Sequence, residues 1–232
     1  MKQLVRAATL GVKALLLAGG IICLTACASA VGPDTQPLMT HDVPAGPQPW
    51  TAAAPNYDAD TVRFAVFSDL TGGERAGVFE LAVEQLNLLR PELVVNVGDL
   101  IEGSTDRAEI DRKWTSFDKR AHQSVAPVLY TGGNHDLLDQ RLRIAWEDRL
   151  GPRYYHVRYR DVLFLVFDTE DHSFERLGEI ASLRQQAIAV ADESGWDAFA
   201  RTDYANLPED ETGMISEAQA AYMKNVIASN SD

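Results

Sequence analysis

Val62-Arg63-Phe64-Ala65-Val66-Phe67-Ser68-Asp69 is the first of two short apolar runs in this chain that end in an aspartate, and Leu93-Val94-Val95-Asn96-Val97-Gly98-Asp99 is the second. A third run, Val125-Ala126-Pro127-Val128-Leu129-Tyr130, leads into Gly132-Gly133-Asn134-His135-Asp136. Short runs rich in β-branched and aromatic residues are typical of buried strands. We therefore expect three strands of a sheet that is covered on both faces.

Two amphipathic segments connect these runs. Apolar residues recur at helical spacing over residues 78–89, where Pro91 closes the segment, and again over residues 110–117. The order strand, helix, strand, helix, strand predicts right-handed βαβ units with parallel strands. The predicted fold class is therefore α/β.

The remainder of the chain predicts further elements around this sheet. A helix is expected from Leu137 to Arg149, and the runs 154–159 and 162–167 are expected to pair as a hairpin. The polar stretch 173–213 has an irregular pattern, which we interpret as an insertion over one face. Ser216 is the predicted N-cap of a last amphipathic helix.

Polar segments follow each of the three strands, at residues 68–73, 98–102 and 132–136. In a parallel sheet the carboxyl ends of the strands open on one edge, where ligands bind, so these segments are expected to be neighbours in space. An oxygen-rich site of this kind suits manganese, iron or zinc. Its two carboxylates, amide oxygen and imidazole belong to Asp69, Asp99, Asn134 and His135.

Each of these residues also has a purely structural interpretation. Asp69 and Asp99 could be helix N-caps, which is the usual role of an aspartate after a strand. Asn134 could occupy a turn in the left-handed conformation. The occurrence of all three at one sheet edge favours the metal site.

These segments resemble the calcineurin-like metallophosphoesterase family, whose early blocks read Asp-x-His, Gly-Asp-x-x and Gly-Asn-His-Asp/Glu in this order. Gly98-Asp99 and Gly133-Asn134-His135-Asp136 match those blocks, and the resemblance covers roughly residues 62–167. The string Ser68-Asp69-Leu70-Thr71-Gly72-Gly73 is similar to a bacterial subgroup of exported members. The resemblance implies a sheet sandwich flanked by helices and the hydrolysis of phosphate monoesters or diesters.

The resemblance also implies a role for each matched residue. Asp69 would bind the first of two divalent metal ions (Mn, Fe or Zn), Asp99 would bridge both, and Asn134 would bind the second. A hydroxide held between the metals would attack phosphorus. His135 would then donate a proton to the leaving alkoxide, with Asp136 holding its ring in orientation.

Three positions depart from the family pattern or have an open role. Thr71 stands where the family has a metal-binding His, and a hydroxyl is a poorer ligand than imidazole. Glu74 occupies a place where the subgroup often has a His; it could supply a carboxylate to the first metal or be a solvated loop residue. Glu102 could line the pocket or cap the next segment.

The family pattern continues beyond the matched region, with a further His after the helix near Ser216 and then a Gly-His-x-His segment. No His follows His172 in this chain. The resemblance therefore implies a domain that is truncated at its C-terminus and lacks part of the active site. The alternative function is a non-catalytic envelope lipoprotein with a binding or scaffold role.

The N-terminal residues have the pattern of an export signal. Three bases and no acid occur within residues 1–13, and an apolar stretch over residues 14–26 is too short to span a bilayer. Leu24-Thr25-Ala26-Cys27 resembles the lipobox of bacterial lipoproteins, which implies a signal peptide of residues 1–26 and a lipid anchor at Cys27. Ala28 favours the periplasmic face of the outer membrane; an ordinary cleaved signal is the alternative.

Composition completes the predicted domain organisation. Residues 27–60 are rich in Pro and small residues and are interpreted as a tether, His41 and Trp50 included, which leaves residues 61–232 for the phosphoesterase domain. The formal net charge of −13 becomes more negative once the three bases of the signal are removed. A surface this acidic repels nucleic acid, so no nucleic-acid partner is expected.

Overall fold

The computed structural model of the chain describes residues 38–51, 54–55, 61–209 and 213–231. They belong to one compact unit that begins at Pro37. The predicted signal peptide, the lipidated Cys27 and the first part of the predicted tether lie outside the described residues. Among the described residues, no helix combines the length and the apolar character needed to cross a bilayer.

A parallel sheet forms the first layer of the fold. Its strands are β2 (Phe64–Phe67), β3 (Leu93–Asn96) and β4 (Val128–Leu129), with β3 in the middle. Phe64 pairs with Leu93, and Val94 pairs with Val128. The three strands and their parallel pairing are those that the apolar runs predict.

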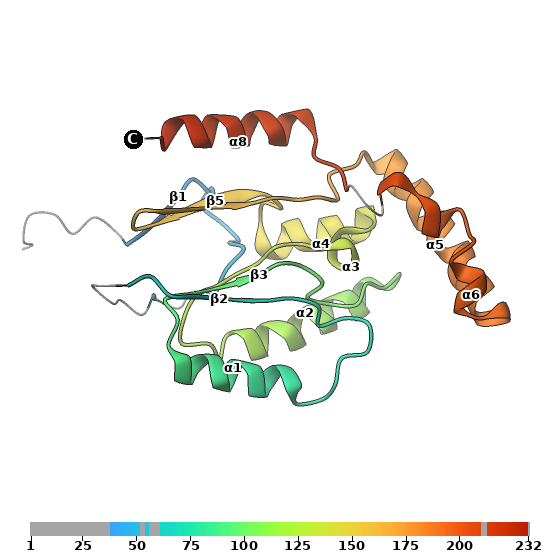
Figure 1. Cartoon of the computed structure of the whole chain (residues 1–232), viewed down its shortest axis with the longest axis horizontal. Coiled ribbons are helices and arrows are strands. Elements are labelled where there is room, and N and C mark those ends of the chain that lie inside the picture. The colour runs from blue at the N-terminus through green and yellow to red at the C-terminus, as the bar shows by residue number, and fades with distance from the viewer. Residues whose placement is uncertain (1–37, 52–53, 56–60, 210–212, 232) are drawn as a thin grey trace, which may run out of the picture. The chain divides into compact units, whose positions relative to one another are not determined.

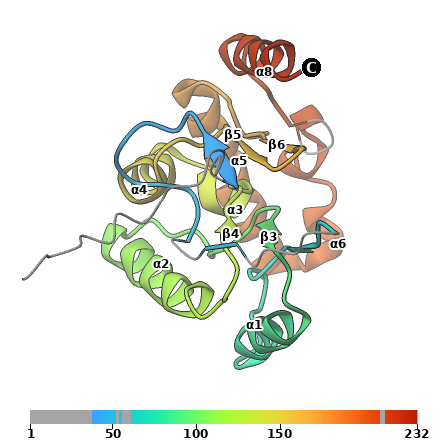
Figure 2. The same cartoon turned by 90° about the vertical axis from the view of Figure 1, so that its left-hand side faces the viewer.

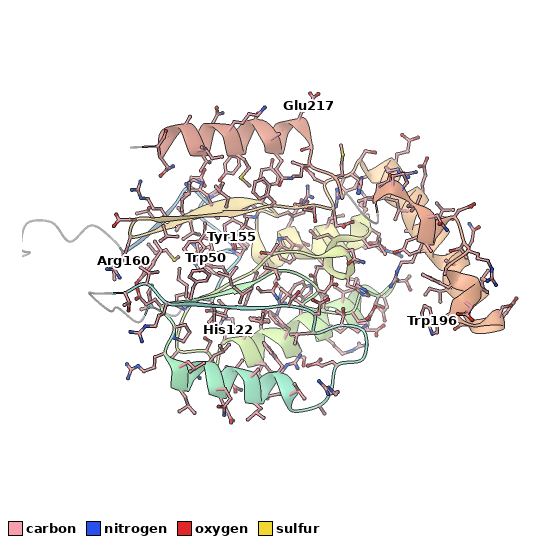
Figure 3. The ribbon with its side chains drawn as sticks, viewed as in Figure 1. Trp50, His122, Tyr155, Arg160, Trp196 and Glu217 are labelled. Atoms are coloured by element: carbon pink, nitrogen blue, oxygen red, sulfur yellow. The ribbon has the colours of Figure 1, made fainter. Side chains whose placement is uncertain are left out.

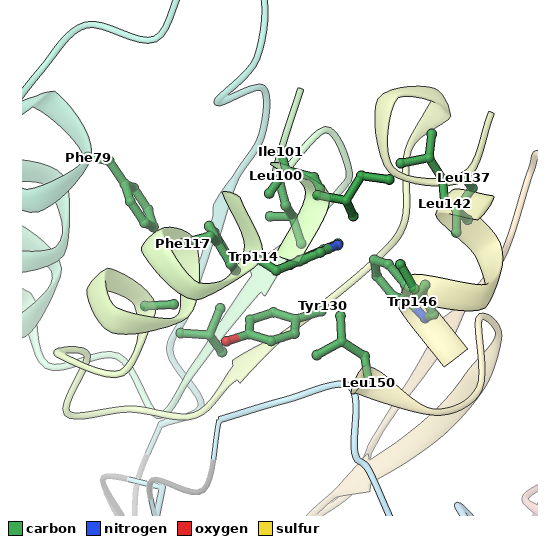
Figure 4. Packing of buried hydrophobic residues seen from close by; sticks show 14 of the residues in the cluster. Phe79, Leu100, Ile101, Trp114, Phe117, Tyr130, Leu137, Leu142, Trp146 and Leu150 are labelled. Atoms are coloured by element: carbon green, nitrogen blue, oxygen red, sulfur yellow. The ribbon is translucent and has the colours of Figure 1, made fainter. Parts of the chain in front are cut away.

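Two helices cover the outer face of this sheet, α1 (Val78–Leu89) and α2 (Arg107–Ala121) (Figure 1). They bury a core in which Phe79 stacks on Phe117 at 5.7 Å between ring centroids, and Trp114 meets Trp146 edge-on at 5.6 Å (Figure 4). Trp114 and Phe117 are fully buried. The apolar face read from the sequence of α2 is therefore the face that packs on the sheet.

A second, antiparallel sheet lies against the inner face of the first. It consists of β1 (Met39–His41), β5 (Tyr155–Tyr159) and β6 (Val162–Val166), with β5 in the middle. β5 and β6 form the predicted hairpin, with Tyr159 opposite Val162. Apolar side chains of both sheets meet between them, and Figure 3 labels Trp50 and Tyr155 in this layer.

The predicted tether is wrong for residues 38–51, which are part of the fold. β1 adds to the edge of the antiparallel sheet, and Trp50 pairs with Leu129 at the edge of the parallel sheet. The N–H of Tyr130 donates to Pro49 O at 2.8 Å. A few apolar side chains, Trp50 above all, anchor this segment because each one reaches the space between the two sheets, so its high proline content does not keep it extended in solvent. We refer to residues 38–51 as the N-terminal strap (blue in Figure 2).

The helix α8 (Glu217–Ser229) covers the outer face of the antiparallel sheet (Figure 1). Its N-cap is Ser216, as predicted, whose side chain accepts the N–H of Gln219 at 3.2 Å. The Tyr222 ring lies 5.5 Å from that of Tyr154. The layers therefore run helices, sheet, sheet, helix, the α/β sheet sandwich flanked by helices that the sequence predicts.

The remaining elements lie at the ends of the strands. The segment predicted as one helix divides into α3 (Asn134–Leu137) and α4 (Gln140–Leu150), because Asp139 is in an extended conformation and caps α4. The predicted irregular insertion is largely helical, with α5 (Phe174–Ser194), α6 (Trp196–Phe199) and the 3-10 turn η1 (Tyr204–Asn206). α5 lies beyond the end of the sheets where β2 and β3 finish (Figure 1).

The prediction that all three parallel strands are covered on both faces is wrong for β2. Phe64 is 52% exposed and Val66 is 57% exposed, whereas β4 is buried. β2 and β4 are both edge strands, but Trp50 of the strap pairs with Leu129 of β4, whereas Phe64 of β2 meets the edge of Phe164 at 5.6 Å. An apolar run therefore does not distinguish a central strand from an edge strand.

Candidate functional site

Asp69 and Asp99 adopt the same unusual backbone conformation at the carboxyl ends of β2 and β3. Their φ angles are 57° and 58°, in the left-handed region that costs a non-glycine residue about 1 kcal/mol. Neither is a helix N-cap, since α1 is capped by Gly77 and α2 by Asp106. Such strain clusters at functional sites. The interpretation of both aspartates as helix N-caps is therefore wrong.

Backbone hydrogen bonds hold the two aspartate loops side by side. The N–H of Asp69 donates to Gly98 O at 3.3 Å, and the N–H of Leu70 donates to Asp99 O at 2.9 Å. The parallel pairing of β2 and β3 thus continues into the loops. The convergence expected from topology is present for these two residues.

Gly133 brings the third segment against Asp99. A Cβ atom at Gly133 would lie 2.3 Å from Asp99 Oδ1, so only glycine allows this approach. The N–H of His135 then donates to Asp99 Oδ1 at 3.1 Å. Asn134 is the first residue of α3, not a left-handed turn residue, so its structural interpretation is also wrong.

The oxygen atoms at this edge match the chemistry of a divalent cation site. No described residue hydrogen-bonds to the side chains of Asp69 and Asn134, and Asp99 Oδ2 has no hydrogen-bond partner among them either. Carboxylate and amide oxygens without partners are available ligands. Among the described residues, no three His, Cys, Asp or Glu side chains lie close enough together to hold a metal ion. A metal site at this edge would therefore need the amide oxygen of Asn134 as one of its ligands.

Glu102, not Asp136, contacts the ring of His135. The distance from His135 Nδ1 to Glu102 Oε1 is 2.8 Å. The predicted orientation of the ring by Asp136 is wrong because that carboxylate lies beneath the site and accepts the N–H groups of Leu100, Ile101 and Gly133 at 2.9 to 3.1 Å. Glu102 caps no helix, since the N-cap of α2 is Asp106.

Asp136 is a buried carboxylate that fixes the backbone around the site. Burial raises the pKa of Asp136 to about 7, and the three N–H groups oppose this effect. Its hydrogen bonds join the start of α3 to the residues that follow Asp99. Asp136 therefore has a positioning role for Asp99 and Asn134 together.

The two departures in the loop after β2 lie together beside Asp69. Thr71 and Glu74 help to line a cavity of about 310 Å³ between this loop and α1. Glu74 is an exposed loop residue, and its carboxylate forms an ion pair with Arg120 of α2. Arg120 also lies over the Phe79 ring at 5.3 Å.

A second cavity contains functional candidates that the sequence analysis did not assign. It has a volume of about 150 Å³, and Asn134, Glu170 and His172 contribute to its wall. Burial raises the pKa of Glu170 to about 7, to which neighbouring Asp168 and Asp99 add. The sequence offered one indication of their role. Glu170 and His172 follow the hairpin directly, at the same end of the fold as the predicted metal ligands.

Comparison with known proteins adds an independent finding. The model of the calcineurin-like phosphoesterase family matches residues 62–205, which is more than half of the chain and includes all three segments that hold the predicted metal ligands. A comparison with individually curated proteins gave no match. Members of this family hydrolyse phosphoester bonds and typically use divalent metal ions. On the strand topology, the three loops and this match together, the chain belongs to the calcineurin-like phosphoesterase family.

Proposed function

We propose that the chain hydrolyses phosphate monoesters or diesters with two divalent ions, Mn, Fe or Zn, and with His135 as the general acid. The observation that carries this proposal is the pair of left-handed aspartates, Asp69 and Asp99, which lie on adjoining loops, with Asp99 packed against Gly133, the residue before Asn134. Two strained carboxylates that directly follow adjacent strands, and cap neither α1 nor α2, have no structural use as caps. A cation site shared by the two carboxylates would explain why the strained conformation occurs at both positions.

Each metal-site residue has a defined contribution in this proposal. Asp69 would hold one ion, Asp99 would contact both, and Asn134 would hold the other through its amide oxygen. When bound, such a pair of ions supplies a water of lowered pKa as the nucleophile and offsets negative charge on the phosphoryl oxygens. The N–H of His135 already fixes Asp99 Oδ1, which leaves Oδ2 without a described partner.

His135 is the residue that would move a proton. Its Nδ1 atom faces Glu102, so its Nε2 atom is the nitrogen available for the leaving oxygen. A ring held at one nitrogen by a carboxylate has a fixed tautomer and direction. Donation of the Nε2 proton to the leaving alkoxide would avoid the release of a strongly basic anion.

The proposal includes the cellular location expected from the sequence. Export, a lipid anchor at Cys27 and a periplasmic position at the outer membrane would place the site among extracytoplasmic phosphoesters. The basis is the export-signal pattern of residues 1–26, the lipobox-like run 24–27 and Ala28.

The test has two measurements on the purified chain with manganese. The first is the content of bound metal, and the second is the rate of hydrolysis of p-nitrophenyl phosphate and of bis-p-nitrophenyl phosphate. Asp99→Asn and His135→Ala are compared with Asp111→Asn, on exposed α2, and His122→Ala at its C-cap. We expect Asp99→Asn to lose bound metal and turnover. His135→Ala should keep the metal and lose roughly a hundredfold or more in rate.

A folded chain with neither bound metal nor turnover would overturn the proposal. That result would favour the alternative of a non-catalytic envelope lipoprotein on a phosphoesterase fold. Equal activity in Asp99→Asn and Asp111→Asn would overturn it as well, because the central carboxylate would then have no role.

A further inference from the structure

The cavity beside Asn134 is built by segments that are distant in the sequence. Residues after β6, the start of α3, the first half of α5 and the turn η1 all contribute to it. It has a volume of about 150 Å³, so at about 30 Å³ per water it has room for about five water-sized groups. The lining residues used below are Asn134, Glu170, His172, Ile180 and Glu209.

His172 is a buried polar side chain without a described hydrogen-bond partner. It is only 8% exposed, and its ring lines the cavity. Its backbone is fixed, because Arg143 Nη1 donates to His172 O at 2.7 Å. No hydrogen bond from a described residue reaches either ring nitrogen. Burial lowers the pKa of His172, so the ring is neutral near neutral pH and offers one donor and one acceptor.

Glu209 presents a second unused polar atom. Arg176 Nε holds Oε1 of Glu209 at 2.7 Å, whereas Oε2 is buried and has no hydrogen-bond partner among the described residues. Its own backbone N–H and the Arg176 guanidinium lower the pKa of Glu209, so the carboxylate is ionised. A buried ionised oxygen without a donor is costly, and a ligand that supplies a donor removes that cost.

The wall of the cavity is rich in hydrogen-bond acceptors. Glu170 and Glu209 contribute carboxylates and Asn134 contributes an amide, whereas Arg143 and Arg176 are not among the described residues that line it. An additional phosphate or carboxylate would face these carboxylates directly and be repelled. A hydroxyl or ammonium group would find acceptors instead. Ile180 supplies an apolar wall for the carbon atoms that carry such a group.

We propose that this cavity binds the alcohol part of the substrate through a hydrogen-bond-donating hydroxyl or ammonium group, so that the preferred substrates are phosphoesters of small polyols or amino alcohols. This inference rests on the proposed function, since Asn134, a proposed metal ligand, lines the cavity. His172 and Glu209 are the specificity-determining residues. Esters with a second phosphate on the alcohol part are excluded.

Kinetics on the full chain with manganese provide the first test. His172→Ala should reduce kcat/KM for glycerol 1-phosphate and phosphoethanolamine by tenfold or more. The same variant should change kcat/KM for p-nitrophenyl phosphate less than threefold, because nitrophenol has no donor to place there. His172→Asn should restore part of the loss, since its amide keeps a donor and an acceptor. His122→Ala is the matched control. An equal loss on all three substrates, or no loss, would overturn the proposal.

A second test needs no turnover. Glycerol and ethanolamine are titrated into the metal-free chain while the imidazole signals are followed by NMR, and the His172 signal is assigned by its absence in His172→Ala. We expect a saturable shift of that signal with both alcohols and none with inorganic phosphate. If the manganese-loaded chain shows no turnover, such a shift in the metal-free chain would still support the cavity assignment, and only the proposed function would be overturned. An unmoved signal, or a shift with phosphate only, would overturn the cavity assignment.

Discussion

His135 Nδ1 lies 2.8 Å from Glu102 Oε1, and the other oxygen of Glu102 accepts the N–H of Gly72 at 3.3 Å. One carboxylate therefore joins the loop after β2, the loop after β3 and the first turn of α3. Arg184 of α5 approaches the same carboxylate at 4.0 Å. Glu102 thus connects the proposed general acid with the helical insertion.

Replacing Glu102 is expected to affect the leaving-group step of the proposed reaction. Glu102→Ala should slow hydrolysis of an alkyl phosphate about tenfold or more, because the His135 ring loses its fixed direction. Turnover of p-nitrophenyl phosphate should fall much less, since nitrophenolate leaves without a proton. Glu84→Gln, at an exposed position of α1, is the control. Equal losses on both substrates would show that Glu102 has no such positioning role.

Trp50→Ala tests whether the N-terminal strap is part of the fold. Trp50 is buried against His41 and Tyr155, with centroid distances of 4.7 Å and 5.7 Å. Its truncation should lower the free energy of unfolding by about 3 kcal/mol, measured by urea denaturation. Trp196→Ala removes a side chain that is 68% exposed and should change it by less than about 0.5 kcal/mol. Similar values for the two variants would mean that the strap is not docked in solution.

Glu170 should make stability depend on pH. Burial raises its pKa from 4.5 to about 7 in the folded chain, so folding favours the protonated form. This contribution is complete below about pH 4.5 and is lost as the pH rises through about 7. Between about pH 4.5 and pH 7, the free energy of unfolding of Glu170→Gln should therefore fall by about 1–2 kcal/mol less than that of the unsubstituted chain. Denaturation curves at several pH values, with Glu84→Gln as control, measure it; an unchanged slope would contradict the prediction.

Asp136→Asn should destabilise the chain while preserving side-chain volume. An amide group would direct its own N–H groups at the N–H donors of Leu100, Ile101 or Gly133, leaving at least one of them unsatisfied. We expect a loss of about 1–3 kcal/mol in the free energy of unfolding. Asp111→Asn, on the exposed face of α2, should have little effect. A neutral result for Asp136→Asn would indicate that the buried carboxyl group is not ionised.

The lipid anchor is tested at Cys27, which lies outside the described residues. Cys27→Ser should abolish incorporation of radiolabelled palmitate and release the chain from the membrane fraction of the cells that express it. Cys23→Ser should leave both unchanged. Labelling of the Cys27→Ser variant would overturn the proposed anchor.

Local patterns in the sequence were sufficient for the parallel sheet, for its helices and for the approach of the Asp69 loop and of Gly133 to Asp99. Strand and helix periodicities are local, and parallel strand order alone brings successive carboxyl ends to one edge. The strap was not predictable in this way. Proline content indicates a chain that cannot fold alone, but Trp50 docks on a core formed by residues about a hundred positions away.

By itself, the sequence determined the family, the α/β order and the residues at the sheet edge, because these follow from motifs and from periodicity along the chain. Only the tertiary structure decided which carboxylate contacts His135, that Glu74 pairs with Arg120, and that His172 and Glu209 share a cavity with Asn134. Those relationships depend on side-chain directions at loop ends and on the packing of α5. Neither is a function of spacing along the chain, so no local pattern specifies them.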